Sequence, residues 1–195
     1  MRHVVYDVTD IGTWACWGVF VLVWGVGALV ARQRGRAAGR QEGHDLASTL
    51  GGFVGFVVVA TPASLWRPLT VGLPWLRVVG LALLVLATAG AIWARVALGD
   101  MWATTARTTE HHALRTSGPY RITRHPIYTA ILGMVVATAL TQGLGRWAAL
   151  CVVVAFIVAV KMRDEEQLLS HEFPEEYRRY RAEVPRLIPG LHRRP

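Results

Sequence analysis

Long stretches of this 195-residue chain contain no charged residue, and this pattern restricts the fold more than any other feature. A helix that crosses a bilayer needs roughly 20 mostly apolar residues, and fewer where flanking basic side chains reach the interface. Five runs have suitable lengths: 13–31, 46–66, 78–94, 126–145 and 147–160. We therefore expect an all-α integral membrane protein with about five transmembrane helices. The last run is the shortest and could instead be a buried helix.

The distribution of basic residues indicates how these spans are oriented. The chain has 21 Lys and Arg against 13 Asp and Glu, an excess that also suits nucleic-acid binding. Here, however, the basic residues gather in 32–40, 107–124 and 161–194, beside the apolar runs, with Arg2, Arg67 and Arg146 on the other side. Because loops rich in Lys and Arg stay cytoplasmic, we expect an inner-membrane protein with its N-terminus outside and its polar segments in the cytoplasm. Membrane lipids, and no nucleic acid, are the expected partners.

Several single features refine this topology. We expect residues 1–12 to form a short external tail, and Trp14 and Trp17 to anchor the first span at the interface. In the second span, Gly51 and Gly55 have the GxxxG spacing that permits close helix approach. Arg95, about one turn inside the cytoplasmic end of the third span, is expected to extend to the interface, with a cavity-facing role as the rarer alternative.

The longest polar segment, residues 110–130, leads directly into the fourth apolar run. It ends with Arg124, His125 and Pro126. Proline suits the first turn of a helix, so Arg124 and His125 are expected at a helix N-terminus, which favours anions. The adjacent His111 and His112 would not share one helical face, and the two cysteines have no metal spacing, so no metal site is expected.

A second polar cluster, Glu165 and Glu166, follows the fifth apolar run at the start of a polar cytoplasmic tail. A short connection joins the fourth and fifth runs, so they should form an antiparallel pair. Arg124, His125 and Tyr128 should then face the two glutamates across the cytoplasmic boundary.

Farther along the tail, Pro174 is expected to start a short helix in which Glu175 and Arg179 form an i,i+4 pair. One face of this helix carries Tyr177, Tyr180 and Val184. We expect this face to pack on the membrane surface or over the polar loop.

These motifs in this order resemble the isoprenylcysteine carboxyl methyltransferase family and its wider relatives among integral-membrane phospholipid methyltransferases. The matching residues are His112, Leu114, Gly118-Pro119-Tyr120, Arg124-His125-Pro126, Tyr128, Glu165-Glu166, Phe173, Tyr177, Tyr180, Val184 and Pro189. They cover roughly the last half of the chain. Ala130 and Pro174 depart from the family pattern, which commonly has glycine at both positions.

The resemblance implies methyl transfer from S-adenosyl-L-methionine to a lipophilic acceptor, an isoprenylcysteine carboxylate or a related lipid. The implied cofactor-binding residues are His112, Leu114, Gly118, Tyr120, His125, Tyr128, Glu165 and Glu166. Arg124 would orient the acceptor, holding a carboxylate by two hydrogen bonds, and Glu166 would take the proton of a thiol or amine acceptor. We accordingly divide the chain into a three-span region, 1–98, and a methyltransferase core, 99–195, within one structural domain.

Two other functions remain open on sequence grounds. A transporter or channel subunit is one, although the uncharged centres of all five runs count against it. An NADPH-dependent membrane reductase of similar layout is the other. Taken singly, the site residues also have purely structural explanations. Arg124 and His125 would be interface anchors, Tyr128 would belong to an aromatic belt, and the two glutamates would be solvated.

Overall fold

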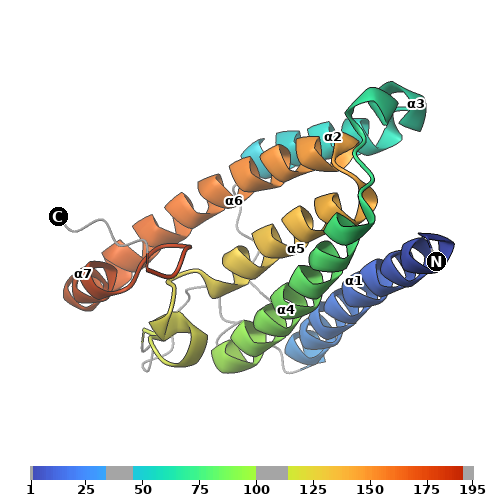
Figure 1. The fold of residues 1–195 in the computed structure, drawn as a ribbon. Coiled ribbons are helices and arrows are strands. Elements are labelled where there is room, and N and C mark those ends of the chain that lie inside the picture. The colour runs from blue at the N-terminus through green and yellow to red at the C-terminus, as the bar shows by residue number, and fades with distance from the viewer. Residues whose placement is uncertain (1, 34–45, 100–113, 191–195) are drawn as a thin grey trace.

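The computed structural model describes residues 2–33, 46–99 and 114–190, and every regular element in these ranges is helical (Figure 1). The α-helices are α1 (Arg2–Gln33), α2 (Leu46–Ala60), α3 (Ala63–Trp66), α4 (Pro74–Leu98), α5 (Pro126–Gln142), α6 (Gly145–Glu172) and α7 (Pro174–Glu183). Two short 3-10 helices, η1 (Arg67–Leu69) and η3 (Gly118–Arg121), accompany them. The predicted all-α class is confirmed.

Three of the described helices, α1, α4 and α6, are long and apolar enough to cross a membrane. The α2 helix and the short helices after it are bent by 93° and make a fourth candidate if the bent pair is one span. The remaining apolar helix, α5, has 17 residues. All five expected runs are therefore helical, and three or four of the helices meet the length of a span.

The fifth apolar run is the shortest in the sequence, but it does not form the short buried helix given as the alternative. Helix α6 has 28 residues because it continues through the charged residues as far as Glu172, so Glu165 and Glu166 lie within it rather than at the start of a separate tail. Helix α5, with 17 residues, is shorter than the three span candidates, and it is more buried than any of them, with α4, α1 and α6 packed against it. Small residues such as Ala130 and Ala137 are among those it buries.

The helices are ordered in space as α1, α4, α5, α6 and α2, which differs from their order in the chain (Figure 1). The expected hairpin of α5 and α6 is present, and Gly143, at φ +78°, makes the turn. Helix α2 packs on α6, where a side chain at Gly51 would collide with Ile157 and one at Gly55 would contact Leu150. The GxxxG spacing thus serves helix packing, as predicted.

The N-terminal residues differ from the prediction. Helix α1 already begins at Arg2, so residues 2–12 belong to this helix and not to a separate tail, and Asp10 lies on it. Asp10 forms an ion pair with Arg77, a buried residue of the first turn of α4. Arg77 is a fourth arginine on the side where Arg2, Arg67 and Arg146 were expected. The Asp10 carboxylate also accepts a hydrogen bond of 2.8 Å from Gln142 of α5.

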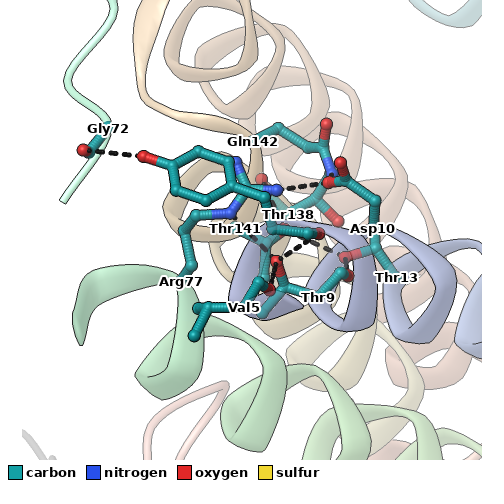
Figure 2. A network of polar contacts seen from close by, with 10 residues as sticks. Val5, Thr9, Asp10, Thr13, Gly72, Arg77, Thr138, Thr141 and Gln142 are labelled. Atoms are coloured by element: carbon teal, nitrogen blue, oxygen red, sulfur yellow. Dashed lines mark hydrogen bonds and ion pairs between the residues drawn. The ribbon is translucent and has the colours of Figure 1, made fainter. Parts of the chain in front are cut away.

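From this ion pair a chain of hydrogen bonds runs into the bundle (Figure 2). Arg77 Nε donates to Thr9 Oγ1 at 2.9 Å, and Thr13 Oγ1 lies 3.1 Å from Thr141 Oγ1. Farther in, Trp17 Nε1 donates to Thr138 Oγ1 at 3.0 Å, so Trp17 joins two helices instead of anchoring the interface as expected. We call these residues the Arg77 network: Thr9, Asp10, Thr13, Trp17, Arg77, Thr138, Thr141 and Gln142.

Arg95, near the other end of α4, also turns toward a neighbouring helix. Its guanidinium lies against Gly27 of α1, and the residue is half-buried. Its extension to the interface stays a prediction.

Candidate functional site

The site begins at the N-terminus of α5, where Pro126 occupies the first helical turn as predicted. The segment 184–188, which follows α7, runs across this helix start. Arg124 N–H donates to Pro185 O at 2.9 Å and His125 N–H donates to Arg186 O at 3.2 Å. The Thr129 hydroxyl donates to Leu187 O at 2.9 Å. Backbone donors just before the helix, which have no partner within it, are therefore satisfied by the C-terminal segment.

Glu166, projecting from α6, is the centre of the site. Its Oε1 atom lies 2.8 Å from Arg124 Nη1, 3.0 Å from His125 Nε2 and 3.2 Å from Arg186 Nε. The side chains of Arg124, His125 and Glu166 are 9%, 3% and 14% exposed, so water screens these charges little. We call the following five residues the Glu166 cluster: Arg124, His125, Glu165, Glu166 and Arg186.

His125 contacts both glutamates of this cluster. Its Nε2 faces Glu166, and its Nδ1 lies 3.6 Å from an oxygen of the more exposed Glu165. Burial alone would lower the pKa of His125, but the hydrogen bonds and charges of Glu165 and Glu166 outweigh burial and raise this pKa above its ordinary value. The fold therefore favours the imidazolium form, with one N–H toward each carboxylate.

Tyr128 lies one turn into α5, next to His125. The two ring centroids are 5.7 Å apart with the planes inclined at 39°, and Tyr128 interacts electrostatically with Glu165. The structure thus brings together the five residues that the sequence placed on facing helices: Arg124, His125, Tyr128, Glu165 and Glu166.

Three other candidate residues belong to the polar segment before α5. Gly118 has φ +65° and starts η3, a conformation that favours glycine. Tyr120 is buried, and its carbonyl accepts a hydrogen bond of 2.6 Å from the Tyr180 hydroxyl. Leu114 packs against the aromatic face of α7. His112, also a candidate, and His111 lie outside the described residues.

The C-terminal helix α7 connects this segment to the cluster. Tyr177, Tyr180 and Val184 form a buried group, so the predicted face exists and it packs over the polar segment. Burial raises the pKa of both tyrosine hydroxyls, which are therefore neutral. The Tyr177 hydroxyl accepts a long hydrogen bond of 3.4 Å from Arg124 Nη1.

Two predictions about charged tail residues need correction. The exposed Glu175 pairs with Arg178 at 2.9 Å, three residues on, and not with Arg179. Arg186 was not singled out from the sequence, although it directly contacts Glu166. The sequence feature that could have identified Arg186 is its position directly after Val184 and Pro185, where the aromatic face ends. From the sequence, this segment was interpreted only as the end of a helix.

The chemistry of the cluster follows from its charges. Two guanidinium groups and the His125 ring surround one carboxylate oxygen, and Glu165 supplies a second, half-exposed carboxylate. Such a group can hold oxyanions through the arginines and accept hydrogen bonds from hydroxyl or ammonium groups through the carboxylates. Among the described residues, no group of three or more His, Cys, Asp or Glu side chains could hold a metal ion.

Two relatives match part of the chain. The cobalt-zinc-cadmium resistance protein CzcN of Cupriavidus metallidurans is 30% identical over 119 residues, which is 60% of this chain and 51% of CzcN. The nickel-cobalt-cadmium resistance protein NccN of Alcaligenes xylosoxydans xylosoxydans is 32% identical over 117 residues, again 60% of this chain and 51% of the relative. The chain thus spans about half the length of the curated relatives it matches.

The match to a protein-family model indicates the class of protein more directly than the two relatives do. The phospholipid methyltransferase model matches residues 75–176, which is more than half of the chain. This range contains α4 apart from its first residue, α5, α6 and, apart from Arg186, the whole Glu166 cluster. The chain therefore belongs to the phospholipid methyltransferase family of membrane methyltransferases.

Proposed function

We propose that the protein transfers the methyl group of S-adenosyl-L-methionine to a lipophilic acceptor, an isoprenylcysteine carboxylate or a related lipid, at the Glu166 cluster. The observation that carries this proposal is the meeting of Arg124 and His125 with Glu165 and Glu166 inside the region that matches the methyltransferase model. The cofactor supplies an already activated methyl group, so the protein's contribution is alignment and exclusion of water.

The residues present suit such a cofactor. Glu165 and Glu166 offer acceptors for ribose hydroxyls and the amino group, while Tyr128 and Tyr120 offer aromatic surface to adenine. Within the described part of the chain, buried guanidinium N–H groups of Arg124 and Arg186 have no hydrogen-bond acceptor, which suits a carboxylate. Our proposed cofactor residues are His112, Leu114, Gly118, Tyr120, His125, Tyr128, Glu165 and Glu166.

Arg124 is the proposed residue that orients the acceptor. In the structure its guanidinium is bound to Glu166 and Tyr177, so an acceptor carboxylate has to share or replace the Glu166 contact. An ionised carboxylate needs no base. For a thiol or amine acceptor, Glu166 is the nearest carboxylate to Arg124 and takes the proton in our proposal.

We also propose that the Glu166 cluster faces the cytoplasm of an inner membrane, with the start of α1 outside. The concentration of arginines beside the cluster supports this orientation through the positive-inside rule. The packing of α4 on α5 supports our view that regions 1–98 and 99–195 form one domain. The match itself begins inside the first region, at residue 75.

Calorimetry on the detergent-solubilised protein tests the proposal against its two alternatives. We expect binding of S-adenosylmethionine and S-adenosylhomocysteine and none of NADPH. Binding of NADPH alone would support a membrane reductase. Failure to bind any of the three compounds would favour a transporter or channel subunit. Transfer of radiolabelled methyl groups into a lipid extract then identifies the acceptor class.

A further inference from the structure

We propose that Arg186 is a second oxyanion-binding residue of the site, and that it and Arg124 together hold a carboxylate or phosphate group of a bound substrate. This inference rests on the proposed function for the identity of its ligands. It concerns a residue outside the region matched by the family model, which ends at residue 176.

The first argument is the fixed position of Arg186. Its carbonyl accepts the His125 N–H at 3.2 Å, and the neighbouring Pro185 carbonyl accepts the Arg124 N–H at 2.9 Å. Thr129 donates a further hydrogen bond to Leu187 O. These three bonds hold the segment 184–188 against the start of α5. These bonds fix the backbone at Arg186, and from this position its guanidinium contacts Glu166.

The second argument is an excess of donors over acceptors. In the described ranges, Arg124 Nε and Arg186 Nε and Nη2 are buried and have no hydrogen-bond partner. Arg186 Nε lies 3.2 Å from Glu166 Oε1, close enough for an ion pair but without the alignment of a hydrogen bond. A buried donor without an acceptor is unfavourable, and more so when it is charged. A ligand oxyanion would remove this cost.

The third argument is charge. The guanidinium groups of Arg124 and Arg186 and the ring of His125 all converge on one oxygen of Glu166, which carries a single negative charge. The planar guanidinium binds carboxylate and phosphate through two parallel N–H groups, a geometry that a single shared oxygen does not provide. A substrate oxyanion would give the two guanidinium groups the paired acceptors that one shared oxygen of Glu166 does not provide.

Two sources could supply this oxyanion, the amino-acid carboxylate of the cofactor or an acidic headgroup of the acceptor. Four ligands separate them. S-adenosylhomocysteine has the carboxylate, whereas 5′-methylthioadenosine lacks the amino-acid part. Dihexanoylphosphatidate has the phosphate, whereas dihexanoylglycerol has the same acyl chains without it.

The test compares Arg186→Ala, Arg186→Lys and the control Arg178→Ala, whose arginine is exposed and pairs with the exposed Glu175. Affinities are measured calorimetrically in detergent, and melting temperatures confirm folding. We expect Arg186→Ala to lose about tenfold in affinity for one oxyanion ligand, corresponding to about 1.4 kcal/mol, but nothing for its matched neutral ligand. Lysine keeps the charge without the fork and should give an intermediate loss. The control should match the wild type.

Loss for S-adenosylhomocysteine alone assigns Arg186 to the cofactor, and loss for the phosphatidate alone assigns it to the acceptor. Equal losses within a matched pair would reveal general disruption and overturn the proposal. So would unchanged affinity for all four ligands. If the wild type binds no S-adenosylhomocysteine, the proposed function fails, and the phosphatidate pair still decides the role of Arg186.

Discussion

Arg77 and Arg124 are both buried arginines paired with a carboxylate, but they lie at opposite ends of α5 in networks of different kinds. In the Arg77 network, Asp10, Thr9 and Gln142 are joined in a continuous set of hydrogen bonds between three helices (Figure 2). In the Glu166 cluster, one carboxylate oxygen serves three cationic groups, and buried donors remain without acceptors. A network with matched donors and acceptors stabilises a fold, whereas the unmatched donors of the Glu166 cluster suit the oxyanion ligand that we propose.

This contrast predicts its largest effect at Glu166. Replacing Glu166 with Gln removes the charge that opposes three cationic groups and, on our proposal, a ligand contact. We expect about a 100-fold loss of S-adenosylhomocysteine affinity, equivalent to about 2.7 kcal/mol. Calorimetry measures it. The exposed Glu175→Gln is the control and should retain wild-type affinity. Unchanged affinity in Glu166→Gln would mean that the two ends of α5 do not differ as we describe.

The Arg77 network should show the reverse behaviour. Arg77→Ala leaves Asp10 and Thr9 without their shared partner. Removing one member of a fully buried ion pair costs about 3–5 kcal/mol, and because the Asp10 side chain is 45% exposed we expect a loss of about 2 kcal/mol of stability. Reversible unfolding in mixed micelles measures this loss. The folded variant should bind S-adenosylhomocysteine like the wild type. A specific loss of affinity without loss of stability would remove the distinction.

A smaller effect should depend on pH. The pKa of His125 is raised in the folded protein, so the imidazolium stabilises the fold fully below about pH 6.5, and this contribution disappears as the pH rises through the folded-state pKa. The difference in melting temperature between wild type and His125→Gln should therefore shrink from pH 6 to pH 9. A difference that grows over this range would contradict the protonated form of His125.

The smallest effect concerns the inner end of the Arg77 network. Thr138→Val removes the acceptor of the Trp17 indole N–H. Hydrogen bonds between membrane helices contribute about 0.6 kcal/mol on average, so we expect a loss of this size. Thr138→Ser keeps the hydroxyl and should restore most of it. The same unfolding assay compares them. A loss above about 2 kcal/mol would show that the threonines, rather than Arg77, hold this end together.

The two regions were unequally predictable from the sequence. The Glu166 cluster was foreseen because its residues flank an apolar hairpin, so a short turn necessarily brings them near each other. The Arg77 network was missed because Asp10 and Arg77 are 67 residues apart, and Asp10 was placed in a tail. Nothing local shows that α1 starts at Arg2 and packs on α4 and α5.

Helix lengths were also only partly predictable. The hydropathy changes between Val160 and Lys161, but the backbone stays helical, because the residues from Lys161 to Glu172 are mostly compatible with a helix. Reading the end of the apolar run as the end of the helix placed Glu165 and Glu166 outside α6. Because Glu166 lies on α6, its side chain contacts Arg124 and His125 at the start of α5.

The sequence by itself determined the apolar helices, the proline-started α5 and α7, and the meeting of Arg124 and His125 with the two glutamates. These features follow from hydropathy, proline chemistry and short connections, which act locally along the chain. Only the tertiary structure decided that α5 is the enclosed helix, that Asp10 pairs with Arg77 and that Arg186 contacts Glu166. Those outcomes depend on which helices pack side by side, and packing is set by the shapes of surfaces distant in the chain.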